Sequence, residues 1–204
     1  NNESISITST DAITKSVTCS GSVTLDNDSK IEAPTVQVAL GNIASIATTS
    51  SSAVEVFRFK ISDAGTADGL ATKVTQVQIK KSTGTADWTN HIAGVGLWDG
   101  AAQITTGTAT ITDGLITFPI TSGNLDIADG TSKEISLKLW LNTTNIVDNA
   151  TMAFTISSAG HGFISDPSGS SFASDFGSAV TSNTISVRIE ATKMIFTQQP
   201  TSLE

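Results

Sequence analysis

Apolar and polar residues alternate in nearly every apolar stretch of this 204-residue chain. In residues 133–141 (KEISLKLWL), isoleucine and leucine occupy every second position, and serine, lysine and tryptophan stand between them. Because successive side chains of a β-strand point to opposite faces, this pattern predicts a strand with one buried face. The alternation is also strong at 53–61, 151–157 and 184–190, and it is weaker at 35–40, 72–80, 91–98 and 102–111.

Asp-Gly pairs mark turns between these strands. They occur at 68–69, 99–100, 113–114 and 129–130. Between alternating apolar residues, this dipeptide is the strongest short-range signal for a β-hairpin. In ATIT-DG-LITF, a two-residue turn at Asp113-Gly114 pairs Ile111 with Ile116 and is expected to be type I′, with positive φ at both turn residues.

The sequence therefore predicts an all-β protein, an antiparallel two-sheet β-sandwich of Ig-like or jelly-roll-like type, without a long helix. No window has the 3.6-residue spacing of an amphipathic helix. The side chains expected to face the core are Phe57, Phe59, Val77, Ile79, Leu137, Leu139, Phe154, Ile156, Val187 and Ile189.

Hydroxyl side chains replace charged ones over much of the sequence. The chain contains 31 Thr and 27 Ser, only 15% charged residues, and a formal net charge of −8. An acidic domain repels polyanions, so nucleic acid is not expected as a partner. Membrane insertion is not expected either, because no apolar run approaches the length that crosses a bilayer. This composition favours a secreted domain at the cell surface.

Three parts are expected along the chain. Residues 1–32 are polar and form an N-terminal segment, either the end of a preceding module or an added strand pair. Residues 33–190 form the β-sandwich module. Within it, the Gly/Ser-rich stretch 158–183 is expected to be a surface loop or partly disordered. Residues 191–204 are expected to be a linker to a following Ig-like domain, ending in a cloning remnant.

The core is expected to be complete by Glu190, where the last alternating strand ends. Beyond it, Met194, Ile195 and Phe196 are apolar but are followed at once by Gln-Gln-Pro, which suits a connecting segment. A chain ending at Ala191 is therefore expected to melt within a few degrees of the full one.

Groups for catalysis are few, and the chain is not expected to be an enzyme. His91 and His161 are the only histidines, and neither lies in an HExxH or HxH pattern. Cys19, the single cysteine, has no neighbour that marks it as a thiolate, and no serine lies in a Gly-x-Ser-x-Gly motif. Paired carboxylates of a glycosidase stay open at this point, because such acids need only meet in space.

Calcium is the one cofactor that the sequence suggests. In Asp63-Ala-Gly-Thr-Ala-Asp68-Gly69, two carboxylates and several carbonyl groups share a short loop after a predicted strand. Calcium prefers such oxygen-rich, flexible sites. The spacing differs from the twelve-residue EF-hand loop, and Asp with Gly is also ordinary turn chemistry, so both interpretations stand. Asp166 and Asp175 form a second, weaker candidate pair.

Tryptophan provides a candidate carbohydrate site. Strict alternation puts Trp140 on the polar face of its strand beside Lys138, where an exposed ring can stack on a sugar. The alternative is that a sheet, a loop or a neighbouring domain covers Trp140. Burial is the stronger expectation for Trp88 and Trp98.

Four segments in this order resemble a known family: VFRFKISDAGTADGLATKVTQVQIK (56–80), ADWTNHIAGVGLWDG (86–100), LDIADGTSKEISLKLWL (125–141) and ISVRIEATKMIFTQQPT (185–201). Over about residues 35–201 the chain resembles a repeat module of giant secreted cell-surface adhesins of gliding bacteria, the SprB-like gliding-motility adhesins. The resemblance implies export, an extended chain of β-sandwiches, and adhesion without enzymatic activity. It supplies no catalytic or ligand residue, and residues 1–34 lie outside it.

Two functions from different classes follow as expectations. The first is a non-catalytic structural and adhesive module of a large bacterial cell-surface protein, with neighbouring β-sandwich modules and a surface polysaccharide as partners. The second is a carbohydrate-binding module attached to a secreted polysaccharide-degrading enzyme. Tandem copies beside this segment would favour the first, and a flanking hydrolase domain would favour the second.

Overall fold

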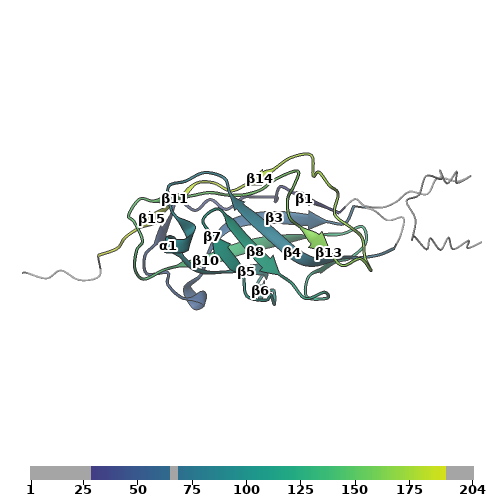
Figure 1. Cartoon of the computed structure of the whole chain (residues 1–204), viewed down its shortest axis with the longest axis horizontal. Coiled ribbons are helices and arrows are strands. Elements are labelled where there is room, and N and C mark those ends of the chain that lie inside the picture. Colours follow the sequence, from purple (N-terminus) through teal and green to yellow (C-terminus); the bar gives the residue numbers. More distant parts are fainter. Residues whose placement is uncertain (1–28, 65–68, 192–204) are drawn as a thin grey trace, which may run out of the picture.

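Two antiparallel sheets face each other in the computed structural model, which describes residues 29–64 and 69–191 (Figure 1). The first sheet has the order β1 (Lys30–Glu32), β3 (Val54–Ser62), β10 (Ser132–Leu141), β5 (Ile92–Asp99) and β6 (Ala102–Gln103). The second has the order β14 (Val180–Thr181), β12 (Phe154–Ile156), β4 (Thr72–Lys81), β8 (Leu115–Pro119) and β7 (Thr110–Thr112). Two short strands, β13 (Ile164–Ser165) and β9 (Asp126–Ile127), also pair with β4.

A third, small sheet closes one end of the sandwich. Its order is β11 (Thr151–Met152), β15 (Ile185–Arg188) and β2 (Asn42–Ala44), with β15 and β2 parallel. Over the described ranges the only helices are η1 (Ser50–Ser52) and α1 (Trp88–His91). The predicted all-β fold without a long helix is confirmed. Of the N-terminal segment 1–32, residues 29–32 are described and include β1, which pairs with β3, whereas residues 1–28 lie outside the described residues.

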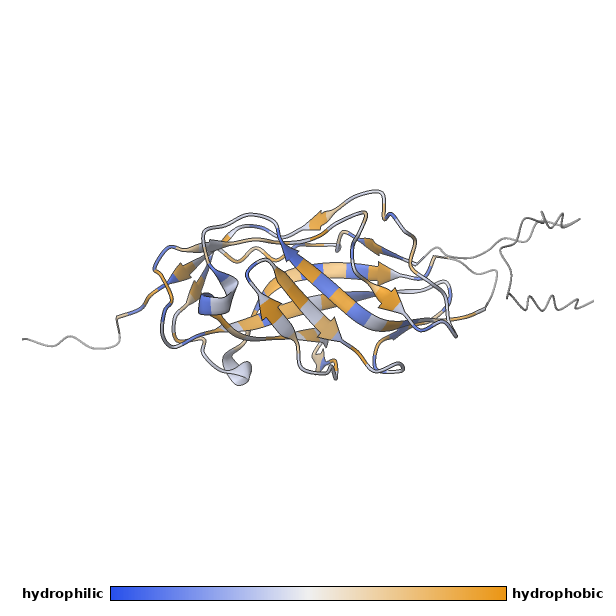
Figure 2. Cartoon of the chain, in the orientation of Figure 1, coloured by the Kyte–Doolittle hydropathy of each residue, from blue (hydrophilic) through white to orange (hydrophobic). Residues whose placement is uncertain are grey.

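The predicted core is formed by the inward residues of both sheets. Figure 2 shows the alternation along β4, where apolar residues face the first sheet. Phe57 and Phe154 stack across the sandwich with ring centroids 6.5 Å apart. Nine of the ten residues expected to face inward are buried. The tenth expectation was wrong: Ile189 is 46% exposed, because β15 ends at Arg188 and Ile189 lies beyond the sheet.

The hairpin at Asp113-Gly114 has the predicted register but a different turn. Ile111 pairs with Ile116 as expected. Only Gly114 has positive φ, so the type I′ turn was wrong. Asp113 is held by contacts outside the hairpin, since its Oδ1 accepts hydrogen bonds from Trp88 N at 3.1 Å and Lys81 Nζ at 2.8 Å. These tertiary contacts fix the Asp113 side chain independently of the turn type.

Residues 35–40 do not form the expected strand. The side chain of Gln37 occupies the place of a strand backbone beside β3: its Nε2 donates to Arg58 O and its Oε1 accepts from Arg58 N, both at 2.9 Å. A side-chain amide carries both a donor group and an acceptor, as a backbone peptide does. The Gln37 side chain therefore satisfies the backbone N–H and C=O of Arg58 without a neighbouring strand.

The Gly/Ser-rich stretch 158–183, called the strap below, is more closely attached than the sequence suggests. Its β13 pairs with β4, and Phe172 bridges to Ser29. The strap contributes an aromatic cluster to the sandwich, made of His161, Phe163, Phe172 and Phe176. Phe163 also meets Phe59 of the first sheet edge-on, at 6.0 Å between centroids. Of the two expectations for this stretch, a surface loop or partial disorder, the structure shows a connection that is held against the sandwich.

Candidate functional site

Trp140 lies on the outer face of the first sheet, as the alternation predicts. Its neighbours along β10, Leu139 and Leu141, are buried in the core, whereas Trp140 is half-buried. Its cross-strand partner on β5 is Gly94. The site thus lies on two paired strands whose opposite faces pack in the core, so the backbone beneath the indole is held in place.

Gly94 makes room for the Trp140 ring. A Cβ placed on Gly94 would lie 2.2 Å from Cζ2 and 2.6 Å from Cε2 of Trp140. Because these distances are far inside van der Waals contact, any side chain at Gly94 would displace the indole. Glycine therefore lets the ring lie directly over the β5 backbone and extend toward the edge of the sheet.

A hollow of about 280 Å³ adjoins the ring. Its described lining residues are Ala93, Gly94, Val95, Thr106, Gly107, Thr108, Ala109, Ile111 and Trp140. None of these nine is charged. An aromatic ring beside two threonine hydroxyls combines an apolar stacking surface with groups that both donate and accept hydrogen bonds. This combination suits an uncharged, hydroxyl-bearing ligand such as a neutral sugar.

The other two tryptophans have structural positions, as expected. Trp98 is buried on the same outer face, and the Nζ atom of Lys138 lies 4.8 Å from its ring centroid, a cation–π contact. Trp88 is fully buried and packs on Phe154 with centroids 4.9 Å apart. Trp140 is therefore the tryptophan with an accessible ring.

Sequence reasoning found Trp140 but missed its surroundings. The residues 106–109 come from the connection between β6 and β7, which carries no motif. Gly94 and Gly96 do stand out in the sequence, as small residues inside a predicted strand. Such glycines indicate close approach of another group, but only the strand register shows that Trp140 is that group for Gly94.

Asp63, one of the two predicted calcium ligands, lies inside the protein at only 3% exposure. Its Oδ2 accepts hydrogen bonds from Thr72 N at 2.9 Å and Thr72 Oγ1 at 2.8 Å. Burial raises the pKa of the Asp63 carboxyl, and the nearby negative charge of Asp129 raises it further, against the lowering effect of the Thr72 hydrogen bonds. Asp68 lies outside the described residues. Calcium binding by Asp63 and Asp68 stays a prediction.

The described residues contain no group of three or more His, Cys, Asp or Glu side chains arranged to hold a metal ion. In the strap, Asp166 accepts a hydrogen bond from Ser168 N at 2.9 Å, and Asp175 accepts one from Gly177 N at 2.8 Å. Each of these carboxylates stabilises its own turn, which is the ordinary use of Asp next to Ser and Gly.

Both histidines use their ring nitrogens in structural hydrogen bonds. In buried His91, Nδ1 donates to Asp87 O at 2.7 Å and Nε2 accepts from Val147 N at 3.1 Å. In buried His161, Nε2 donates to Ala173 O and Nδ1 accepts from Phe163 N, both at 3.0 Å. Each ring therefore fixes a neighbouring loop. Cys19 lies outside the described residues.

His161 leads to a prediction for stability against pH. Burial lowers the pKa of His161 below its usual range, because a charged ring is disfavoured there. The unfolded chain takes up the proton near pH 6.5 while the folded chain resists it. The stability due to neutral His161 is thus complete above this pH and is lost as the pH falls from there through the lower pKa of the folded chain. Urea unfolding midpoints between pH 8 and 5 should decline less in His161→Gln than in the parent, and equal slopes would contradict this.

No protein-family model matches the chain, and no curated protein matches its sequence. Among the helices of the described residues, none has the length and apolar character needed to cross a membrane. Function must therefore be inferred from the geometry of the chain itself.

Proposed function

We propose that this chain is a non-catalytic structural and adhesive repeat module of a large bacterial cell-surface protein. The position of the two chain ends carries this proposal. The described chain begins near β1 at one end of the elongated sandwich and leaves beyond β15 at the opposite end (Figure 1). In many domains the termini lie close together. Ends at opposite poles instead allow modules to be joined in series without folding back, so that each adds its full length to an array.

The composition supports the same proposal. With 58 hydroxyl residues and few long charged side chains, the surface has little side-chain entropy to lose when it packs or binds. A net charge of −8 keeps such modules soluble and apart at a crowded cell surface. These properties suit a spacer that also carries a ligand site.

The ligand proposed for the Trp140 hollow is an uncharged surface polysaccharide. The hollow is lined by an indole, threonines and small apolar residues, without a charged side chain among the described lining residues. Among the described lining residues of the hollow, none is a cation with which an acidic polysaccharide could pair. Sugar rings present apolar C–H faces and hydroxyl edges, which match the indole and the threonines.

The same hollow favours one alternative, a carbohydrate-binding module of a secreted polysaccharide-degrading enzyme. The two functions differ in what flanks this segment in the full coding sequence. Tandem β-sandwich modules on either side are the expected finding for the adhesive array. A flanking hydrolase domain would contradict the array and support the enzyme-borne module.

Substituting Trp140 tests the ligand site. In affinity electrophoresis through gels that contain neutral or acidic polysaccharides, the parent chain should be retarded only by neutral ones. Trp140→Ala should bind about tenfold more weakly, because it removes the stacking surface.

Trp140→Phe is the matched control and should keep most of the retardation, since it retains an aromatic face. Retardation by acidic polysaccharides would contradict an uncharged ligand, and equal retardation of the parent and Trp140→Ala would show that the hollow is not the ligand site.

A further inference from the structure

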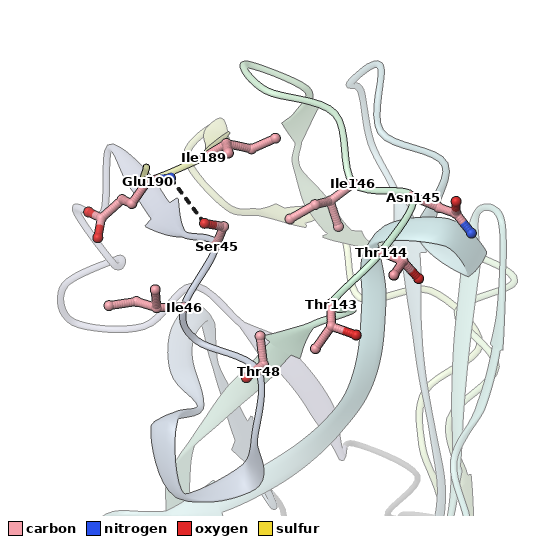
Figure 3. Close-up of a pocket in the computed structure, with 9 residues that line it drawn as sticks. All are labelled: Ser45, Ile46, Thr48, Thr143, Thr144, Asn145, Ile146, Ile189 and Glu190. Carbon is pink, nitrogen blue, oxygen red and sulfur yellow. Dashed lines mark hydrogen bonds between the residues drawn. The ribbon is translucent and has the colours of Figure 1, made fainter. Parts of the chain in front are cut away.

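A second hollow lies at the end of the sandwich where the described chain leaves. Its volume is about 560 Å³, and its described lining residues are Ser45, Ile46, Thr48, Thr143, Thr144, Asn145, Ile146, Ile189 and Glu190 (Figure 3). Ile46 is 59% exposed and Ile189 is 46% exposed. Single exposed apolar residues are common on protein surfaces, but several around one hollow indicate a site for another apolar group.

The exit of the chain is fixed at the rim of this hollow. Ser45 N donates to Arg188 O at 2.8 Å, and Glu190 N donates to Ser45 Oγ at 3.0 Å, which continues the parallel pairing of β2 and β15. From the other side, Ile189 N donates to Asp148 Oδ1 at 2.8 Å. The backbone is therefore held as far as Glu190, and residues 191 onward start from a defined point beside the hollow.

The sequence that follows carries apolar residues within reach. After Ala191, thirteen residues remain, and Met194, Ile195 and Phe196 form their one apolar run. An extended chain advances about 3.3–3.6 Å per residue, so Phe196 can lie no more than about 18 Å from Ala191. The exposed isoleucines at the hollow and this apolar run are thus within reach of each other along the chain. Glu190 at the rim also has an opposite charge, Lys193, three residues further on.

We propose that the hollow is the docking site of the chain's own segment Met194–Phe196. The sandwich core is closed without this segment, because Ile185 and Val187 are already buried. The docked segment would instead fix the direction in which the chain leaves, so that the joint to whatever follows is stiff rather than freely hinged. This proposal is independent of the ligand proposed for Trp140.

Thiol reactivity tests the docking in the full chain. With Cys19→Ser as background, Thr143→Cys places a reporter in the hollow, at an exposed position where the change of size is small. Its rate of reaction with a thiol reagent is compared between the natural tail and a tail with Met194→Ser, Ile195→Ser and Phe196→Ser. If the segment covers the hollow most of the time, the reporter in the chain with the natural tail should react at about one fifth or less of its rate in the chain with the serine tail.

Val36→Cys is the matched control, since Val36 is 65% exposed and does not line the hollow. Its rate should be the same with both tails. Equal rates at Thr143→Cys with both tails would overturn the proposal. Protection that grows with protein concentration would overturn it in favour of a second copy of the chain. Faster reaction at both cysteines with the serine tail would mean that the tail belongs to the core, which also overturns it.

Discussion

Truncating Phe154 to alanine is expected to lower the free energy of unfolding by about 3–5 kcal/mol. Phe154 is fully buried and joins three parts of the fold. It belongs to the second sheet, stacks on Phe57 of the first at 6.5 Å, and packs on Trp88 of α1 at 4.9 Å. Alanine would leave a cavity that neither sheet can fill, because both are held by their own ladders.

Urea unfolding followed by circular dichroism and by tryptophan fluorescence measures this loss. Val36→Ala serves as the control, because its side chain is 65% exposed and its removal should change the free energy of unfolding by less than about 0.5 kcal/mol. A loss of less than about 1 kcal/mol in Phe154→Ala would contradict a core shared by both sheets.

The strands and the core were predictable because their signal is local. The period of two in 133–141 reports directly which side chains face inward, and nine of the ten inward assignments are confirmed. Ile189 shows where this reasoning fails. Alternation continues through 184–190, but β15 pairs with β11 only at Ile185 and Ser186 and with β2 only as far as Arg188, so Ile189 lies beyond the sheet.

The strap was not predictable, because its order depends on contacts distant in the sequence. Its composition is that of a loop, and its aromatic residues follow no single period, since 161 and 163 are two apart whereas 172 and 176 are four apart. Phe163 nevertheless packs on Phe59, more than a hundred residues earlier, and Phe172 bridges to Ser29. Only the assembled sandwich brings these partners together, so the sequence pattern alone favours disorder.

The candidate ligand site was only partly predictable from the sequence. The outward position of Trp140 follows from alternation within β10, and the structure confirms that position. The hollow beside it needs the register of β5 and the path of residues 106–109, which alternation does not supply. The end hollow likewise depends on β2 and β15 pairing in parallel across more than 140 residues of sequence.

Truncating Phe163 to alanine is expected to lower the free energy of unfolding by about 3 kcal/mol and to detach the strap. Phe163 is buried, and its ring meets those of Phe59, Phe172 and Phe176 at centroid distances of 6.0, 5.4 and 6.2 Å. No other strap residue touches the first sheet through a ring contact in the described structure. Removing this ring therefore separates the remaining aromatic cluster from the core.

Limited proteolysis under native conditions, with the cleavage sites mapped by mass spectrometry, measures the detachment. In Phe163→Ala, cleavage should concentrate within 158–183. Local opening of this stretch costs less free energy in the variant, because no Phe163 ring has to leave the core. Ile164→Ala is the matched control: the adjacent side chain is 51% exposed, so its removal leaves the aromatic contacts intact and should leave both stability and cleavage near those of the parent. Equal cleavage in the two variants would mean that β13 pairing with β4, rather than the aromatic cluster, holds the strap in place.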